Sequence, residues 1–348
     1  MYERMTVLTN DPQNNLSSDS AGCVQVREGT LHRAGTMRLH HGGELDDVRI
    51  AWRITGPESA PIVVALGGIS GHRQVFTSGD DGAGWWNGIA GPGLAVPAER
   101  FRILAFDYLG GSGDSTSPRN GAAFPSVSTY DQAECLIALL DHLGIPRLHA
   151  IIGASYGGMV ALAFAERYCD RVAQLLIVSA ADRAHPMATA WRSVQRRVIR
   201  LGIESGRPAQ GLELARALAM ATYRSPAEFA ERFASTPTSR DGRFIFPVEE
   251  YLMARGEAYA RRYQPDGFLT MSESIDLHRI DAARVSVPVT AIAVREDQLV
   301  PIEDIRAMCA RLPHAQLHEI SSIFGHDAFL KEMSVLKRLF EPALETPK

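Results

Sequence analysis

The chain has 348 residues, of which 45% are hydrophobic and 22% are charged, so it can form a core of full size. Its formal net charge is -4, so the composition does not indicate a protein that binds nucleic acid or anionic membranes through a basic surface. No segment approaches the roughly 18 consecutive apolar residues that a membrane-spanning helix requires.

Residues 1–22 are polar and lack the apolar core of a signal peptide, so we predict a disordered tail on a cytoplasmic protein. The four cysteines form no CxxC pair and have no metal-ligand spacing. We therefore predict no metal site and no resident cofactor. Cys135 and Cys169 fall in apolar helical patterns and are predicted to be buried thiols, which suits a reducing compartment.

The first half of the chain reads as a strand–helix alternation. Residues 24–53 alternate short apolar and polar stretches between glycines, which predicts a pair of antiparallel strands. Apolar runs typical of buried strands follow at 61–66, 101–106, 148–152 and 172–179. Helical spacing over 130–143 and 158–165 separates the last three of these strands. This order predicts a mostly parallel, doubly wound sheet, with the active site at the carboxyl ends of its strands.

From residue 183 to 281 the pattern becomes helical and arginine-rich, which predicts an inserted helical lid. The helix candidates are 190–201, 211–223, 226–233 and 248–263. Strands at 287–294 and 315–320 then resume the alternation, with a helix over 302–312 between them and a final helix after 324–330. The core is therefore predicted to comprise 23–182 and 282–348.

The strongest motif is Gly153-Ala154-Ser155-Tyr156-Gly157, which lies between an apolar run and a helix rich in small residues. Strand, G-x-S-x-G and helix form the nucleophile elbow of the α/β-hydrolase fold, so we predict that fold and a nucleophilic Ser155. The glycines let the strand and the helix pack closely around a strained turn.

A serine nucleophile needs a base, and the base needs an orienting carboxylate, in the chain order Ser, Asp or Glu, His. Asp297 lies just past one predicted strand, and His326 lies in the loop after the last. Glu296 and Asp304 are the competing acids, but one is expected to face elsewhere and the other to lie in a helix. The competing histidines, none with this placement, are His72, His185, His314 and His318.

The oxyanion that forms during acyl transfer needs two backbone N–H donors. We predict the N–H of Tyr156, directly after the nucleophile, and that of Ile69 in the glycine-rich loop 67–71. These features permit an esterase, a lipase, a peptidase or an acyltransferase. A haloalkane-type hydrolase is excluded because it requires an aspartate nucleophile.

Several further stretches narrow the choice. They are GWWNG (84–88) with GPG (91–93), YLGG (108–111) with GDSTSP (113–118), QR (195–196), TYRS (222–225), VEEYL (248–252) and GHDAFL (325–330). Over residues 36–340 the chain resembles the homoserine O-acyltransferases. It departs from them at Tyr156, where methionine is usual, at the loop 67–71 and at Asp107-Tyr108.

The resemblance implies ping-pong transfer of an acyl group from acyl-CoA, through a Ser155 acyl-enzyme, to the hydroxyl of L-homoserine in methionine biosynthesis. It also implies a homodimer, and the apolar faces of the lid helices can form its interface. Acyl-CoA is then a co-substrate. Serine as acceptor, a carboxylic-ester hydrolase with the same triad and a catalytically silent scaffold stay as alternatives.

The resemblance also implies substrate-binding residues. Arg196 is the candidate for the acceptor carboxylate and Tyr223 a weaker pocket candidate. Asp327, directly after His326, is either a substrate ligand or a helix N-cap. Succinyl is slightly favoured over acetyl as the donor group, because basic residues are available for its distal carboxylate. These are Arg73, Arg192 and Arg197.

Overall fold

The computed structural model describes residues 25–78, 83–119 and 123–345, so the predicted tail at 1–22 lies outside the described residues. An eight-stranded sheet runs through the molecule in the order β1-β2-β4-β3-β5-β6-β9-β10. The strands are β1 (Val26–Arg38), β2 (Glu44–Thr55), β3 (Ile62–Leu66), β4 (Arg102–Phe106), β5 (Ala150–Ala154), β6 (Leu175–Val178), β9 (Val289–Val294) and β10 (Ala315–Ile320).

The register of the sheet follows the sequence pattern. The pairs β1–β2 and β2–β4 are antiparallel, and every other neighbouring pair is parallel. Strands β5, β6 and β9 are buried along their whole length, which explains why their sequences are continuous apolar runs. The predicted α/β-hydrolase architecture, a mostly parallel sheet with helices and an inserted lid, is confirmed.

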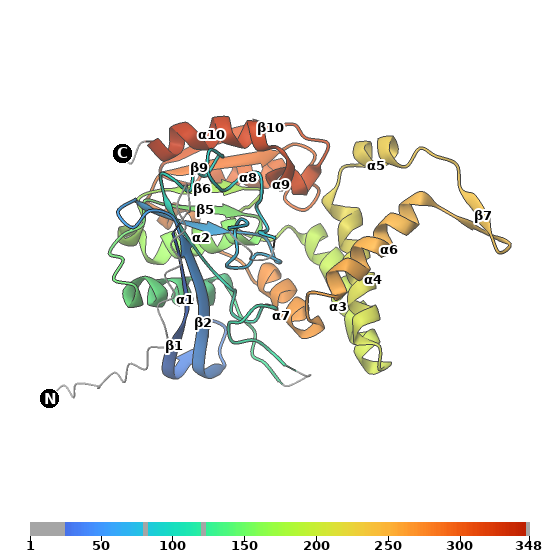
Figure 1. The fold of residues 1–348 in the computed structure, drawn as a ribbon, viewed down its shortest axis with the longest axis horizontal. Coiled ribbons are helices and arrows are strands. Elements are labelled where there is room, and N and C mark those ends of the chain that lie inside the picture. The colour runs from blue at the N-terminus through green and yellow to red at the C-terminus, as the bar shows by residue number, and fades with distance from the viewer. Residues whose placement is uncertain (1–24, 79–82, 120–122, 346–348) are drawn as a thin grey trace.

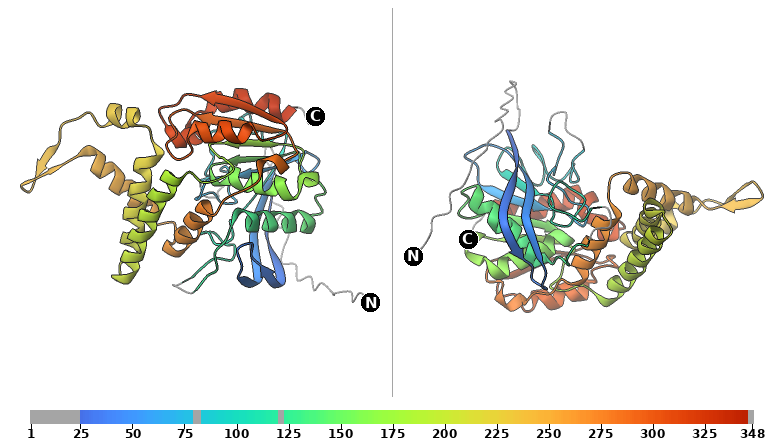
Figure 2. Two further views of the ribbon diagram at one scale, coloured as in Figure 1. Left: turned by 180° about the vertical axis from the view of Figure 1, so that it is seen from behind. Right: turned by 90° about the horizontal axis from the view of Figure 1, so that it is seen from below.

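Helices cover both faces of the sheet (Figures 1 and 2). On one face, side chains of α1 (Thr129–His142), α2 (Tyr156–Arg167) and α8 (Ile302–Cys309) pack into the larger core cluster. On the other face, α10 (Met333–Glu345) packs with side chains from residues 75–76 and 86–101. The short helix α9 (Ala328–Lys331) leads into α10.

The lid lies between β6 and β9 in the chain. Its elements are α3 (Pro186–Glu204), α4 (Pro208–Tyr223), α5 (Pro226–Arg232), β7 (Thr238–Arg240), β8 (Arg243–Ile245), α6 (Pro247–Ala260) and α7 (Pro265–Asp276). All five helices begin with proline in their first turn, where its fixed φ and missing N–H fit. The β7–β8 hairpin projects away from the body at the far right of Figure 1.

Two features differ from expectation. Helix α7 was not predicted, although Pro265 begins it and Phe268, Met271 and Ile275 bury one face at helical spacing. The prediction for Cys169 was wrong: α2 ends at Arg167, and Cys169 is exposed in a 3-10 turn, whereas Cys135 is buried as expected.

Candidate active site

The turn from β5 into α2 presents Ser155 at the carboxyl edge of the sheet. Ser155 has φ of 54° and ψ of −121°, a strained conformation for a residue with a side chain. The backbones crowd so closely that a Cβ on Gly157 would lie 2.1 Å from the carbonyl oxygen of Leu66. A Cβ on Gly153 would lie 2.4 Å from the carbonyl oxygen of Gly157. Both glycines of the motif are therefore sterically required.

The three predicted catalytic side chains form one hydrogen-bonded row. His326 Nε2 lies 2.8 Å from Ser155 Oγ, and His326 Nδ1 lies 2.7 Å from Asp297 Oδ2. The other carboxylate oxygen of Asp297 accepts from the backbone N–H groups of Leu299 (2.8 Å) and Val300 (3.0 Å). This fixes the carboxylate, which orients the imidazole so that its Nε2 faces the serine.

His326 is a buried imidazole beside a buried carboxylate. Burial lowers the pKa of His326, but Asp297 raises it, by charge and by hydrogen bonding, so that on balance the pKa lies above 6.5. The positive charge of Arg192 acts in the opposite direction and lowers this pKa. Glu296, the competing acid, instead accepts the backbone N–H of Ser322 at 2.8 Å and so braces the loop that carries His326.

The glycine-rich loop after β3 lies directly against the nucleophile. A Cβ on Gly68 would lie 3.7 Å from Ser155 Cβ, and Ile69 borders the same cavity as Ser155. Tyr156 begins α2, and its buried side chain turns away to Ser274, whose Oγ lies 2.7 Å from the phenol oxygen. The backbone N–H groups of Ile69 and Tyr156 remain our prediction for the oxyanion donors.

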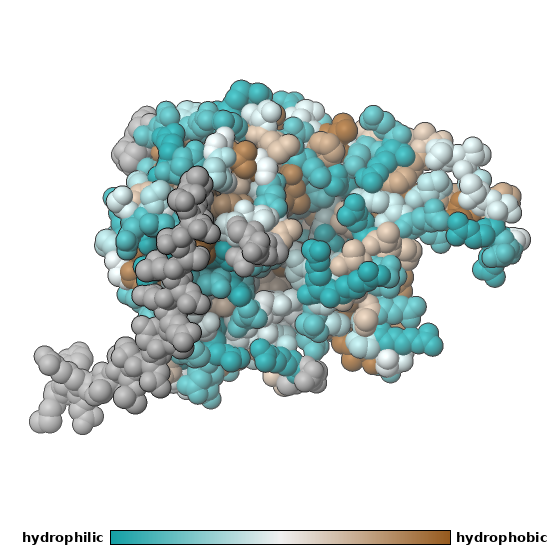
Figure 3. Space-filling model, in the orientation of Figure 1, coloured by the Kyte–Doolittle hydropathy of each residue, from teal (hydrophilic) through white to brown (hydrophobic). Residues whose placement is uncertain are grey.

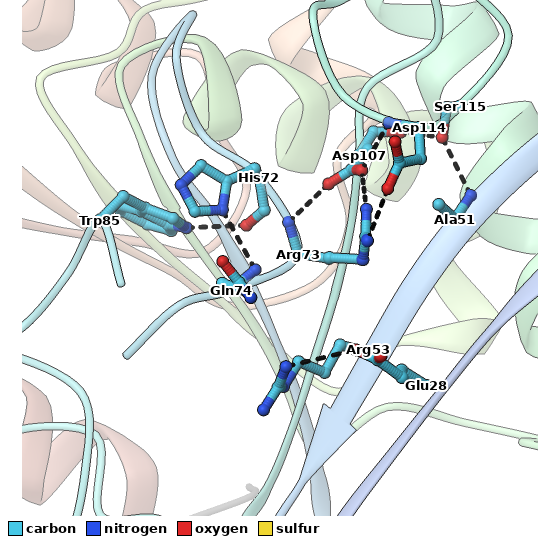
Figure 4. A network of polar contacts seen from close by, with 10 residues as sticks. All are labelled: Glu28, Ala51, Arg53, His72, Arg73, Gln74, Trp85, Asp107, Asp114 and Ser115. Atoms are coloured by element: carbon cyan, nitrogen blue, oxygen red, sulfur yellow. Dashed lines mark hydrogen bonds and ion pairs between the residues drawn. The ribbon is translucent and has the colours of Figure 1, made fainter. Parts of the chain in front are cut away.

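Arg73 fastens this loop to the turn after β4 (Figure 4). Its guanidinium pairs with Asp107 and, at 2.6 Å, with Asp114, and its backbone N–H donates to Asp107 Oδ1 at 2.8 Å. Asp107 is 2% exposed and also accepts the backbone N–H of Asp114 at 2.9 Å. Arg73 is therefore committed to two carboxylates, and its placement does not support the prediction that it binds substrate.

The lid covers Ser155 and leaves a cavity between lid and sheet. Its walls include Ser155, His326 and Ile69 from the core, and Arg192 and Tyr223 from the lid. The ring of Tyr223 lies 5.9 Å from that of His326, centroid to centroid. Tyr223, the weaker pocket candidate, thus lies next to the row of Ser155, His326 and Asp297.

Arg196 lies close to this cavity but does not border it. Its guanidinium pairs with Asp276 at 2.5 Å and donates to the carbonyl oxygen of Ser272 at 3.1 Å. Arg192, one turn earlier on α3, pairs with the same carboxylate at 2.7 Å and does border the cavity. Its Nη2 is buried without a well-formed hydrogen bond. The prediction that Arg196 binds the acceptor carboxylate therefore stays untested.

Asp327 lies between His326 and an arginine that the sequence reading passed over. Arg224 Nε lies 2.9 Å from Asp327 Oδ2, and Arg224 Nη1 donates to Glu228 at 3.1 Å. Both Asp327 and Arg224 are less than a tenth exposed. Asp327 also precedes α9 at its N-cap position but makes no side-chain cap hydrogen bond. A signal for Arg224 was present, since it belongs to the TYRS stretch at 222–225.

Known proteins share both the fold and the sequence pattern of this chain. A sequence model of the α/β-hydrolase fold matches residues 61–332. The homoserine O-succinyltransferase of Xanthomonas campestris pv. campestris is 43% identical over 310 residues, which are 88% of this chain and 82% of that protein. The chain belongs to the homoserine O-acyltransferase family.

Other members and relatives differ in donor and acceptor. The serine O-succinyltransferase of Litchfieldella anticariensis is 32% identical, with 85% of this chain and 92% of that protein covered. The solved homoserine O-acetyltransferase from Staphylococcus aureus superposes with a TM-score of 0.78 at 26% identity, covering 92% of this chain and 95% of that one. Family membership therefore indicates acyl transfer but does not identify the acyl donor or the acceptor.

Within 25–78, 83–119 and 123–345, no three His, Cys, Asp or Glu side chains are grouped so that they can hold a metal ion. Across the same ranges, no helix has both the length and the apolar character needed to cross a membrane.

Proposed function

We propose that this protein transfers a succinyl group from succinyl-CoA to the side-chain hydroxyl of L-homoserine. The observation that carries the proposal is the row Ser155–His326–Asp297 beneath a cavity whose lid wall presents Arg192. The 43% identity to a homoserine O-succinyltransferase supports the same donor and acceptor. We also propose that the reaction serves methionine biosynthesis in the cytoplasm.

In the first half-reaction, Ser155 Oγ attacks the thioester carbonyl carbon while His326 Nε2 takes the hydroxyl proton. Backbone N–H groups of Ile69 and Tyr156 stabilise the resulting oxyanion. The carbon–sulfur bond then breaks, and the CoA thiolate leaves with the proton from His326. The product is a succinyl ester on Ser155.

In the second half-reaction, the hydroxyl of homoserine attacks this ester while His326 Nε2 accepts its proton. The bond to Ser155 Oγ breaks, and His326 returns the proton to the serine, which releases O-succinylhomoserine. Water competes for the acyl-enzyme at about 55 M, so the acceptor must be held in place and water excluded. The lid over Ser155 serves both needs.

The charges on the lid wall favour a donor with a distal carboxylate. Arg192 and Arg196 share the single carboxylate of Asp276, so two cations and one anion leave a net charge of +1 there. An acetyl group has no charge to pair with this excess, whereas the carboxylate of a succinyl group does. Of the arginines predicted for this role, Arg73 is bound elsewhere and Arg197 is exposed on the lid surface.

The charges around Asp327 are balanced and suit a zwitterionic acceptor. Arg224 and Asp327 form one ion pair, and Glu228 forms ion pairs with Arg224 and Arg232. We propose that the ammonium of homoserine binds Asp327, which Arg224 holds in place beside His326. Serine carries the same charged groups on a shorter side chain, so the distance from Asp327 to the acyl carbon discriminates between the two acceptors.

Steady-state assays with succinyl-CoA and acetyl-CoA test the donor. The wild-type protein is expected to prefer succinyl-CoA with homoserine as acceptor. Arg192→Gln is expected to lower kcat/KM for succinyl-CoA by about 10- to 100-fold more than for acetyl-CoA, because it removes a charged hydrogen bond. Arg197→Gln, on the exposed side of α3, is the matched control. A wild-type preference for acetyl-CoA would contradict the donor assignment.

The same assays separate the alternatives. A carboxylic-ester hydrolase would turn over p-nitrophenyl acetate at a rate that added homoserine does not divert. A serine acyltransferase would use serine with the higher kcat/KM when the two acceptors are compared directly.

A further inference from the structure

Two tyrosines at which this chain departs from the family pattern lie in contact with each other. Tyr156 directly follows the nucleophile, and Tyr108 lies in the turn after β4. Their rings are nearly perpendicular, with centroids 5.0 Å apart, and both side chains are buried. The two departures therefore form one aromatic pair, which a methionine at position 156 could not make.

Tyr108 connects this pair to the glycine-rich loop 67–71. Its O–H donates to the carbonyl oxygen of Gly67 at 2.7 Å. Burial raises the pKa of Tyr108 well above its ordinary value of 10.0, so the phenol stays protonated and remains a donor. The loop begins at Gly67, directly after β3, and contains Ile69, our predicted oxyanion donor. Tyr108 therefore holds the loop at the point where it leaves the sheet.

The residue next to Tyr108 holds the other end of the same loop. Asp107 Oδ1 accepts the backbone N–H of Arg73 at 2.8 Å, and the carboxylate pairs with the guanidinium of Arg73 (Figure 4). Asp107 is itself held by the backbone N–H of Asp114, which donates to it at 2.9 Å. Because Asp107 and Tyr108 are consecutive, one turn after β4 fastens the glycine-rich loop at both ends.

Tyr156 is held on its other side by the lid. Its phenol oxygen lies 2.7 Å from Oγ of Ser274, a buried residue on α7. The ring of Tyr156 therefore cannot turn away from Tyr108 without breaking this hydrogen bond. The backbone N–H of Tyr156 is the other predicted oxyanion donor. One residue thus offers a donor from its backbone and supports, through its side chain, the tyrosine that holds the loop of the second donor.

We propose that Tyr108 is a positioning residue for oxyanion stabilisation, which holds the glycine-rich loop so that the N–H groups of Ile69 and Tyr156 face one point. The ring of Tyr156 supports Tyr108 in this role. The inference rests on the proposed function, since it specifies how this chain places the two donors that acyl transfer needs. Such donors act when they lie about 2.7–3.1 Å from the oxyanion, so a small shift of the loop weakens them.

The principal test is Tyr108→Phe, which keeps the ring and removes the hydroxyl that holds Gly67. With succinyl-CoA and homoserine, kcat is expected to fall by about 10- to 100-fold, because a displaced donor stabilises the oxyanion less. Both half-reactions pass through an oxyanion, so both are expected to slow. The KM values for the two substrates are expected to change by less than about threefold, because ground-state binding does not use these donors.

A boronate inhibitor measures the oxyanion site more directly. In 3-boronopropanoic acid, boron takes the place of the acyl carbon of a succinyl group. The boron accepts an electron pair from Ser155 Oγ while His326 takes the hydroxyl proton, and the tetrahedral borate places an oxygen where the oxyanion forms. Tyr108→Phe is expected to weaken this binding by about the same factor as kcat, and to leave the dissociation constant of free CoA unchanged.

Two further variants separate positioning from a general loss of structure. Tyr168→Phe removes a phenol that hydrogen-bonds to Glu134 at the far end of α2, so kcat and boronate binding are expected to be unchanged. Tyr156→Phe keeps the ring and removes its hydrogen bond to Ser274, so it is expected to show a smaller loss than Tyr108→Phe, again in kcat rather than KM. Thermal melting shows whether each variant is folded.

The outcomes separate this inference from the proposed function. If the wild-type protein transfers an acyl group to homoserine but Tyr108→Phe keeps its kcat and boronate affinity, the inference fails and the proposed function stands. A rise in KM at constant kcat also overturns the inference, because the tyrosine would then act on substrate binding. If Tyr108→Phe does not fold, Tyr156→Phe decides by the same measurements.

A wild-type protein that transfers no acyl group to homoserine would instead overturn the proposed function. The same variants are then compared in the hydrolysis of p-nitrophenyl acetate, which forms an oxyanion at the same serine. There, a fall in kcat for Tyr108→Phe but not for Tyr168→Phe supports the positioning role, and an unchanged kcat for Tyr108→Phe contradicts it.

Discussion

At the scale of single residues, catalysis depends on the protonation state of His326. The imidazole can accept the proton of Ser155 only when it is neutral, and its pKa lies above its ordinary value of 6.5 because of Asp297. Arg192 is the opposing charge, since it lowers this pKa. The charge of Arg192 at the cavity and the protonation of His326 are therefore coupled.

The pH dependence of kcat/KM follows from this. As pH falls through the pKa of His326 the base becomes protonated, so activity is expected to fall, with the midpoint of this acid limb above pH 6.5. Arg192→Gln removes a charge that lowers the pKa, so the midpoint is expected to move to higher pH. The measurement is a pH–rate profile with acetyl-CoA for both proteins. A midpoint that moves to lower pH in the variant would refute the coupling.

The hydrogen-bonded row of Ser155, His326 and Asp297 could be predicted because strand order fixes where their loops meet, whereas the side chains that line the cavity could not. Arg192 and Arg196 lie four residues apart on α3, so periodicity places both on one face. Asp276, on the unpredicted helix α7, pairs with both arginines, and of the two only Arg192 borders the cavity. The positions of these side chains thus depend on a partner that lies 80 residues from Arg196 in the chain.

At the scale of elements, the strands and helices of the core lie close to their predicted bounds because each has a strong local pattern. The predicted helix over 130–143 is α1 (Thr129–His142), and the strand over 61–66 is β3 (Ile62–Leu66). Helix α7 escaped prediction because Gly267 and its serines dilute the apolar pattern. Local pattern also gives no information on the contact between Arg73 and Asp107, which holds the end of the glycine-rich loop 67–71 against the turn after β4.

At the scale of the whole molecule, the lid presents apolar side chains outward. Met187, Val194 and Leu201 recur every seven residues along α3 and are 53%, 53% and 57% exposed. The opposite face of α3 buries Ala188 and Ile199. Figure 3 shows brown, hydrophobic surface among the teal side chains on the lid side. A seven-residue apolar stripe is typical of helices that pair, so we propose a homodimer through the lid.

Size-exclusion chromatography with light scattering tests this proposal. The wild-type protein is expected to have the mass of two chains, and Val194→Glu the mass of one, because the substitution places a charge in the centre of the stripe. Arg200→Glu is the control substitution, because Arg200 is exposed on a different side of α3 from the stripe. A wild-type protein that is monomeric at micromolar concentration would contradict the proposal.

We propose that Ser155 carries an acyl group from CoA to homoserine. Mass spectrometry of the intact protein mixed with succinyl-CoA tests it most directly. We predict that the wild-type protein gains the mass of one succinyl group, that Ser155→Ala gains none, and that homoserine removes the group to yield O-succinylhomoserine. A protein that forms no adduct with any acyl-CoA, or whose adduct is lost to water at a rate that homoserine does not change, would contradict the account.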